Sequence, residues 1–212
     1  VASIGAKAKI VRSFKSFLVA LHVGNDPYTV YWSDESAPDE IPDDWDYTSS
    51  SNLAGRNMLP ASDGQLVDCR VLGDSNIIYT DFAAYAMRLV ANATYVFSFN
   101  RLNARGLLNK SCVVPFETNH FCVGEQAIYI HDGSRVTRIA DNYIEDRFFA
   151  AVSDRSLVSV SKDESNHEIA ILYPDGGDTY PTRVLRWNWQ ENNWTFTTID
   201  DGVDEVPCVR LS

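Results

Sequence analysis

NHFCVGEQAIYIHDGSRVTRI, residues 119–139, predicts an antiparallel meander of three short strands. Two apolar runs, residues 121–123 and 127–130, are followed by a third run that begins at Val136 and includes Ile139. Asp132-Gly133 separates the second run from the third. An Asp-Gly pair between apolar runs favours a type I′ hairpin turn, which needs positive φ at both central residues. Short antiparallel strands joined by tight turns are the building unit of a propeller blade or a barrel.

Other parts of the chain look like loose copies of this unit. The strand–turn–strand cores align on Phe17, Ile77, Phe121 and His167, at intervals of roughly 45 to 60 residues, which is close to the period of propeller blades. The sequence therefore predicts an all-β, β-propeller-like fold of about four blades of short antiparallel strands. A β-sandwich stays open as an alternative, because regularly spaced short strands also fit it. The expected strands are residues 9–14, 17–23, 28–32, 66–72, 76–80, 84–90, 95–99, 112–116, 121–123, 127–130, 136–139, 157–160, 167–173, 183–189, 194–199 and 206–211.

One stretch interrupts this rhythm with a helical pattern. Ile144, Phe148 and Ala151 follow an i, i+4, i+7 spacing, which places them on one face of a helix. Asn142 is the expected N-cap, and Glu145 three residues later is its expected capping-box partner. The sequence predicts one short helix near residues 143–152.

A second stretch, residues 35–63, is rich in Ser, Pro, Asp and Asn and is expected to form a long inserted loop. Residues 101–109 are expected to be a shorter polar connection. Loops as long as residues 35–63 are uncommon in compact domains and often carry a function or a partner contact. Trp45 is expected to anchor this loop to the body of the protein, because a large aromatic side chain gains most by burial.

Length and charge narrow the function classes. The chain has 212 residues and a net charge of −11, which fits a single β-propeller-like domain over residues 1–212. The 18 basic residues are scattered among 29 acidic ones, whereas specific binding to DNA needs clustered Lys and Arg. No apolar run has the length of a membrane span, so no membrane insertion is expected. The chain begins with Val1 and shows no signal-peptide pattern, and we expect it to be a fragment of a longer protein.

The four cysteines are Cys69, Cys112, Cys122 and Cys208, and none belongs to a C-x-x-C pair. Each lies in an apolar, strand-like run. We expect buried free thiols that pack as small hydrophobic side chains in a reducing compartment.

Candidate chemistry rests on two sets of residues. His22, His120, His131 and His167 recur once per unit but occupy unlike positions, so a shared metal site is not expected. Carboxylates recur at strand ends, where propeller glycosidases place their acid and base, but an Asp at a strand end also accepts N–H bonds within its turn. The acidic segment 200–205 has oxygen ligands but lacks the order of an EF-hand calcium loop. The strand-end candidates are Asp34, Asp81, Asp132 and Asp175.

Several segments together carry a family resemblance. They are IIYTDFAAYAMRLV (77–90), YVFSF (95–99), GLLNKSCVVPF (106–116) and CVGEQAIYIHDGSRVTRI (122–139). These segments resemble the tail nozzle proteins of short-tailed bacteriophages, namely tail tubular protein B and the related tail-hub proteins that stabilise packaged DNA. YTVYWSD (28–34) followed by Asp43-Asp44-Trp45, the helix at 143–152 and RWNWQENNW (186–194) are also similar to that family.

The resemblance implies a β-propeller-like body in a ring of identical subunits, commonly six, which forms the distal tail tube of the virion. Such a ring docks on a tail adaptor or connector and lets DNA pass without binding it specifically. Assembly takes place in the host cytoplasm. Known members are longer than this chain, which supports the expectation of a fragment. The family carries no catalytic residues, so we expect no enzyme and no catalytic, cofactor or metal residues here.

Two alternative functions stay open on the sequence alone. One is a β-propeller glycan-binding or glycoside hydrolase module that uses the four strand-end carboxylates. The other is a Kelch-like scaffold, because Gly176-Gly177 precedes Trp187 and Trp194 in the fourth unit.

Overall fold

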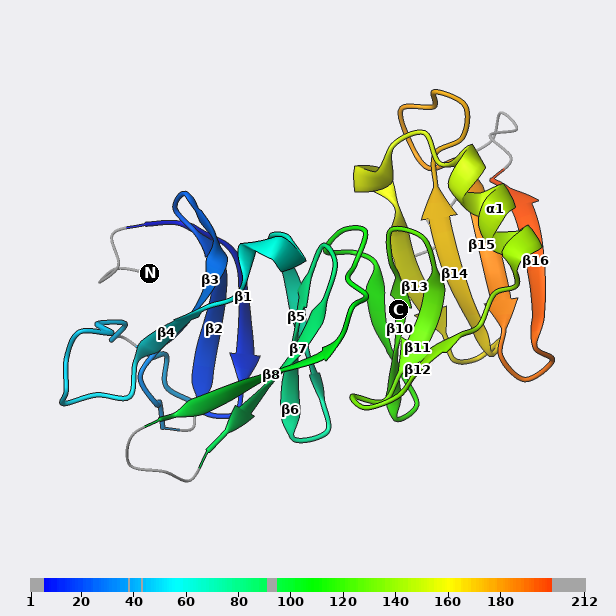
Figure 1. Cartoon of the computed structure of the whole chain (residues 1–212). Coiled ribbons are helices and arrows are strands. Elements are labelled where there is room, and N and C mark those ends of the chain that lie inside the picture. The colour runs from blue at the N-terminus through cyan, green and yellow to red at the C-terminus, as the bar shows by residue number, and fades with distance from the viewer. Residues whose placement is uncertain (1–5, 38, 43, 91–94, 200–212) are drawn as a thin grey trace. The chain divides into compact units, whose positions relative to one another are not determined.

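Sixteen strands form four antiparallel sheets in the described part of the chain (Figure 1). The computed structural model describes residues 6–37, 39–42, 44–90 and 95–199. The chain divides into two compact units, Val1–Gly106 and Leu107–Ser212, and each unit holds two sheets. Every sheet consists of four strands that follow one another in the sequence, so the meander predicted from residues 119–139 is repeated four times.

The first unit contains two sheets that share one aromatic core. Figure 1 draws the first sheet in blue to cyan and the second in cyan to green. The ring of Phe97 meets the rings of Phe17, Trp32 and Phe14, with centroids 5.0, 5.3 and 5.9 Å away. The strands are β1 (Ala8–Phe14), β2 (Phe17–Val23), β3 (Asp26–Trp32), β4 (Gly55–Met58), β5 (Leu66–Leu72), β6 (Ser75–Thr80), β7 (Ala84–Leu89) and β8 (Phe97–Asn103).

The burial of these strands follows from their side-chain patterns. In β1, Ile10 and Phe14 are buried and the residues between them are more exposed, so the strand turns one face to the core. β2 reads FLVALHV and is buried along almost its whole length, as expected for a strand covered on both faces. In β6 all six residues are buried.

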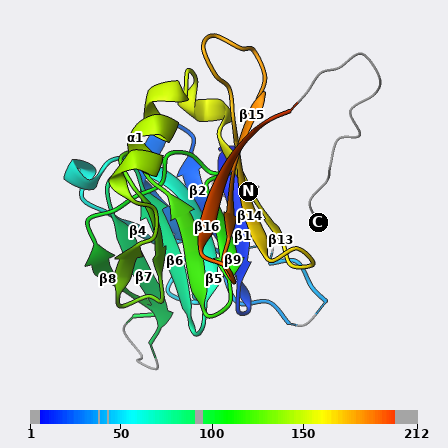
Figure 2. The same ribbon diagram turned by 90° about the vertical axis from the view of Figure 1, so that its right-hand side faces the viewer.

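The second unit also contains two sheets and one helix. Its core joins the sheets through Trp187, whose ring centroid lies 5.4 Å from that of Phe116 and 5.9 Å from that of Phe121. Both ribbon views show α1 beside the sheet of β13–β16 (Figures 1 and 2). The elements are β9 (Val113–Phe116), β10 (Asn119–Val123), β11 (Ile128–His131), β12 (Val136–Arg138), α1 (Asn142–Ala151), β13 (Ser159–Asp163), β14 (Glu168–Tyr173), β15 (Arg183–Asn188) and β16 (Asn193–Thr198).

Helix α1 forms where the sequence predicted it, but its cap differs. The N-cap is Asp141, whose carboxylate accepts a hydrogen bond from the Ile144 amide at 2.9 Å, so the expectation of Asn142 was wrong by one residue. Glu145 is buried and does not close a capping box. Its Oε1 accepts from the Ile128 amide at 2.8 Å and its Oε2 from Arg138 Nε at 2.6 Å, which ties α1 to the neighbouring sheet.

The expected loop at residues 35–63 is shorter than predicted. Gly55–Met58 forms the edge strand β4, and a short 3₁₀ helix occupies Ala61–Asp63. GRNM has no apolar alternation, and its extended form depends on the ladder with β3, in which Met58 is paired with Thr29. Trp45 is buried against Ala20 and Tyr31, which confirms that it anchors the loop.

Two smaller expectations were also wrong. β8 extends to Asn103, so part of the polar connection expected at residues 101–109 is strand. The hairpin between β11 and β12 is present, but its ladder ends at the His131–Val136 pair, which leaves four residues in the turn. Asp132 does not have a positive φ. In that turn only Gly133 does, with a φ of 88°. The turn is therefore not of type I′.

The structure confirms the all-β class, the four antiparallel sheets with the strand order of propeller blades, and the short helix. Within the described residues each sheet is open, because its first and last strands do not pair with each other. Closure of the blades into a ring stays a prediction. The strand expected at 206–211 and the acidic segment 200–205 lie outside the described residues. No helix in residues 6–37, 39–42, 44–90 and 95–199 has the length and hydropathy needed to cross a membrane.

Candidate functional site

The two strand-end carboxylates of the first unit accept hydrogen bonds from backbone amides. Asp34 Oδ1 accepts hydrogen bonds from the amides of Glu35 and Leu53, both at 2.8 Å, and so joins the two ends of the loop. Asp81 Oδ2 accepts from the Gln65 amide at 2.7 Å. Only the bond from Glu35 to Asp34 lies within the turn, as the turn interpretation of strand-end Asp predicted. The Leu53 and Gln65 amides belong to segments 19 and 16 residues away in the sequence, so these two bonds tie separate segments together.

The two strand-end carboxylates of the second unit also have local partners. Asp132 Oδ1 accepts from the amides of Ser134 and Arg135 at 2.8 and 2.7 Å, and these bonds hold the pKa of its carboxyl below its usual range. Asp175 pairs with Arg183, Nε to Oδ2 at 3.0 Å. In the described residues, each of the four candidates is therefore bonded to a backbone amide or to an arginine.

The four histidines occupy different environments. His120 and His131 face each other across β10 and β11, are almost fully buried, and have ring centroids 5.6 Å apart. Burial and then the neighbouring His120 lower the pKa of His131 to about 4. His22 and His167 are half-buried and adopt positive φ, 55° each. Among the described residues, no group of three or more metal-binding side chains comes together.

Three cysteines lie in the described part of the chain, and all three are buried free thiols, as expected. Burial raises the pKa of Cys69 and of Cys112 to about 12. Thiolate is the reactive form of cysteine, so such thiols serve packing rather than chemistry. Cys208 lies outside the described residues.

Two ionic clusters of the first unit were missed at the sequence level. Asp68 is buried between Arg12 and Arg70, and its position inside the apolar run LVDCRVL was a usable sign of a buried ion pair. Asp63 accepts two bonds from Arg101, at 2.8 and 2.9 Å, and one from the Tyr85 hydroxyl. The sequence does not predict this second cluster, because its members lie in separate elements and far apart in the chain.

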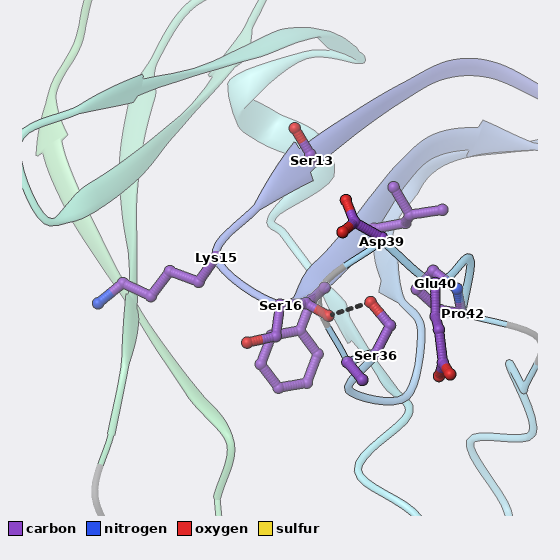
Figure 3. Close-up of a pocket in the computed structure, with 10 residues that line it drawn as sticks. Ser13, Lys15, Ser16, Ser36, Asp39, Glu40 and Pro42 are labelled. Atoms are coloured by element: carbon purple, nitrogen blue, oxygen red, sulfur yellow. Dashed lines mark hydrogen bonds between the residues drawn. The ribbon is translucent and has the colours of Figure 1, made fainter.

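A cavity of about 360 Å³ lies beside the β1–β2 hairpin tip, and it is the candidate contact site of the first unit. The tip turns at Lys15, which has a φ of 53°. The following loop is held to the tip by Ser36, whose amide and hydroxyl both donate to the Ser16 carbonyl, at 2.9 and 3.3 Å (Figure 3). The carboxylates of Asp39 and Glu40 line the same cavity, whereas Lys15 extends away from them.

This cavity has the chemistry of an acceptor surface. The two carboxylates accept hydrogen bonds, and the serine hydroxyls can donate or accept. Its floor includes the buried hairpin residue Phe17. The arrangement suits contact with N–H donors or cationic groups of a partner surface.

Comparison with known proteins adds no relative. No protein-family model matches the chain, and no curated protein matches its sequence.

Proposed function

We propose that this chain is a structural component of a phage virion, a subunit of the tail nozzle or tail tube that lines the DNA ejection channel. In this proposal, identical subunits form a ring of six, the number common in the resembled family, and the ring docks on the tail adaptor or connector. The chain acts by assembly and carries no catalytic role.

The observation that carries the proposal is the repetition of one four-stranded antiparallel meander four times. The resembled nozzle family is expected to have such a propeller-like body. Because a fold hosts many functions, the sequence resemblance over residues 76–139 is the second support. The cavity lined by Asp39 and Glu40 gives the first unit a polar surface that suits docking.

The charge of the chain supports passage of DNA rather than its retention. The net charge is −11, and like charge repels a phosphate backbone. An acidic channel wall lets DNA slide through without being held. The alternative of a glycan-binding or hydrolase module has no specific observation in its favour, because each of the four strand-end carboxylates is already bonded to a backbone amide or an arginine.

Negative-stain microscopy of the purified protein, with its mass from light scattering, tests the proposal. We expect closed rings with one fixed subunit number. The Asp39→Ala/Glu40→Ala variant changes the docking cavity and not the ring contacts, so we expect it to form the same ring. A protein that stays monomeric at the highest soluble concentration argues against the nozzle role. So does tight, salt-sensitive binding of duplex DNA in a filter-binding assay.

A further inference from the structure

A second cavity, of about 270 Å³, lies in the second unit between the last turns of α1 and the end of the sheet β14–β16. Tyr173, Arg183 and Thr198 are neighbours in one row across β14, β15 and β16, so their side chains share the face that α1 covers. Phe196 lies two residues before Thr198 on that same face. Arg147 reaches the cavity from α1.

The two arginines are fixed in place and keep donors available. The Arg147 guanidinium lies over the Phe196 ring, 4.1 Å from its centroid, and makes no hydrogen bond or ion pair with any described residue. Arg183 uses Nε for Asp175 at 3.0 Å and Nη1 for the Thr198 hydroxyl. Its Nη2 has no hydrogen-bond partner in the described part of the chain.

The Tyr173 hydroxyl supplies a third donor. The residue is only 3% exposed, lines the cavity, and its hydroxyl has no hydrogen bond to the described residues. Its ring is held against Phe148, with centroids 5.0 Å apart. Burial and then Asp175 raise the pKa of Tyr173, whereas Arg183 and Arg147 lower it, so its hydroxyl feels all three charges. The hydroxyl oxygen itself is reached by solvent from the cavity, so it can donate a hydrogen bond to a ligand there.

Charge and size define what fits. Two guanidinium groups and one carboxylate line the cavity, so the net charge of its lining is +1. The carboxyl end of α1 at Ala151 adds only a partial negative charge. Its volume is below the range of roughly 300–1,000 Å³ of whole-ligand pockets. It is therefore suited to a single charged group with a short carbon stem. Guanidinium groups match the planar fork of a carboxylate, and Ala151 and the edge of Phe196 can contact the stem.

We propose that this cavity binds one carboxylate group, held by Arg147, Arg183 Nη2 and the Tyr173 hydroxyl. The group belongs either to a glutamate side chain of a partner protein or to a free short-chain carboxylic acid. The assignment stands on the second unit alone and does not depend on the nozzle role.

Isothermal titration calorimetry at constant ionic strength tests the assignment, with N-acetylglutamate amide, butyrate and inorganic phosphate as probes. We expect saturable binding of the carboxylates with a Kd on the order of 1 mM. Arg147→Met removes the guanidinium group and Tyr173→Phe removes the hydroxyl, and each keeps most of the packing volume. Each is expected to weaken binding roughly tenfold. The matched control is Arg186→Met, on the opposite face of β15 from Arg183, which leaves the Kd unchanged.

The probes separate the two sources of the carboxylate. Tighter binding of N-acetylglutamate amide than of butyrate assigns the site to a protein side chain, and equal binding assigns it to small acids. The proposal is overturned if neither carboxylate saturates the protein, or if binding is the same in wild type, Arg147→Met and Tyr173→Phe. Phosphate that binds more tightly than both carboxylates and responds to the same two substitutions also overturns it.

Discussion

Arg12 and Asp68 form a two-point ion pair that joins β1 of the first sheet to β5 of the second, with Nε–Oδ1 and Nη2–Oδ2 distances of 3.1 and 3.0 Å. Arg70 Nε lies 3.3 Å from the same Oδ2. The Asp68 side chain is fully buried, whereas both arginines are about one-third exposed. One carboxylate is thus shared by two guanidinium groups between neighbouring sheets.

Asp68→Ala is expected to destabilise the first unit. The change leaves two guanidinium groups without the carboxylate that pairs with both, and each side chain is about one-third exposed. We therefore expect a loss of about 2 kcal/mol rather than the larger cost of breaking a fully buried pair. Hydrogen exchange of β1 and β5 peptides reports the local loss. Glu164→Ala breaks the exposed Lys162–Glu164 pair and is the control, with an expected effect much smaller than that of Asp68→Ala. Equal effects of the two substitutions would contradict the importance of burial at Asp68.

The Asp63 cluster predicts acid sensitivity of the same unit. Hydrogen bonds from Arg101 and then Tyr85 lower the pKa of Asp63, so the folded state holds this carboxyl ionised more strongly than the unfolded state does. The resulting stability is present above the ordinary Asp pKa of about 3.9 and is lost as pH falls below it. Asp63→Asn should flatten the dependence of unfolding free energy on pH between about 5 and 2. Asp74→Asn, at an exposed carboxyl in the β5–β6 turn, is the matched control for the removal of one carboxylate.

The strands that the sequence predicted well share one property: their apolar side chains repeat along the segment itself. β2 is a nearly continuous apolar run, β6 carries Ile77, Ile78 and Tyr79 in succession, and α1 shows its period in Ile144, Phe148 and Ala151. β4 reads GRNM and lacks such a pattern. It is extended because its backbone pairs with β3. Elements that depend on a partner for their structure cannot be found from local periodicity.

The same physical limit applies to the sites. The local role of a carboxylate such as Asp132 was predictable, because the amides that donate to it lie two and three residues away. The row of Tyr173, Arg183 and Thr198 depends on the register of three strands, and Arg147 joins it from a helix. A one-residue slip in either ladder would turn these side chains to the opposite face. Sequence spacing alone does not specify that register.

The buried pair His120–His131 predicts a second pH effect, in the second unit. The pKa of His131 is about 4 in the folded protein and about 6.5 when unfolded, so the unfolded state binds more protons between these values. Stability is therefore complete above about pH 6.5 and falls as pH drops towards 4, by up to about 3 kcal/mol. His131→Asn keeps an acceptor for the Gly133 amide but does not titrate, and should reduce this dependence. Urea titrations at pH 7.5 and 4.5 measure it, and an unchanged difference between the two pH values would contradict the role of His131.

The buried thiols are expected to resist alkylation in the folded protein. With pKa values of about 12, Cys69 and Cys112 carry roughly a thousandfold less thiolate at pH 8 than a cysteine of ordinary pKa. Iodoacetamide followed by peptide mass spectrometry should leave both unmodified until urea unfolds the chain. Fast labelling of either cysteine in the native protein would contradict this expectation and would mean that the backbone around it opens locally.

Trp45 decides whether the loop that frames the first cavity keeps its place. Its side chain is buried against Ala20 and Tyr31, whereas Ile41 in the same loop is 85% exposed. Trp45→Ala removes the anchor, which lowers the free energy of local opening of the loop by at least about 1.4 kcal/mol. We therefore expect the loop amides to exchange at least roughly tenfold faster. β2 should keep its protection, since its own ladder with β1 does not involve the loop. Ile41→Ala is the matched control and should leave exchange unchanged. If β2 and the loop lose protection together, Trp45 is part of the core of the unit and the loop is not a separate element that the anchor holds at the cavity.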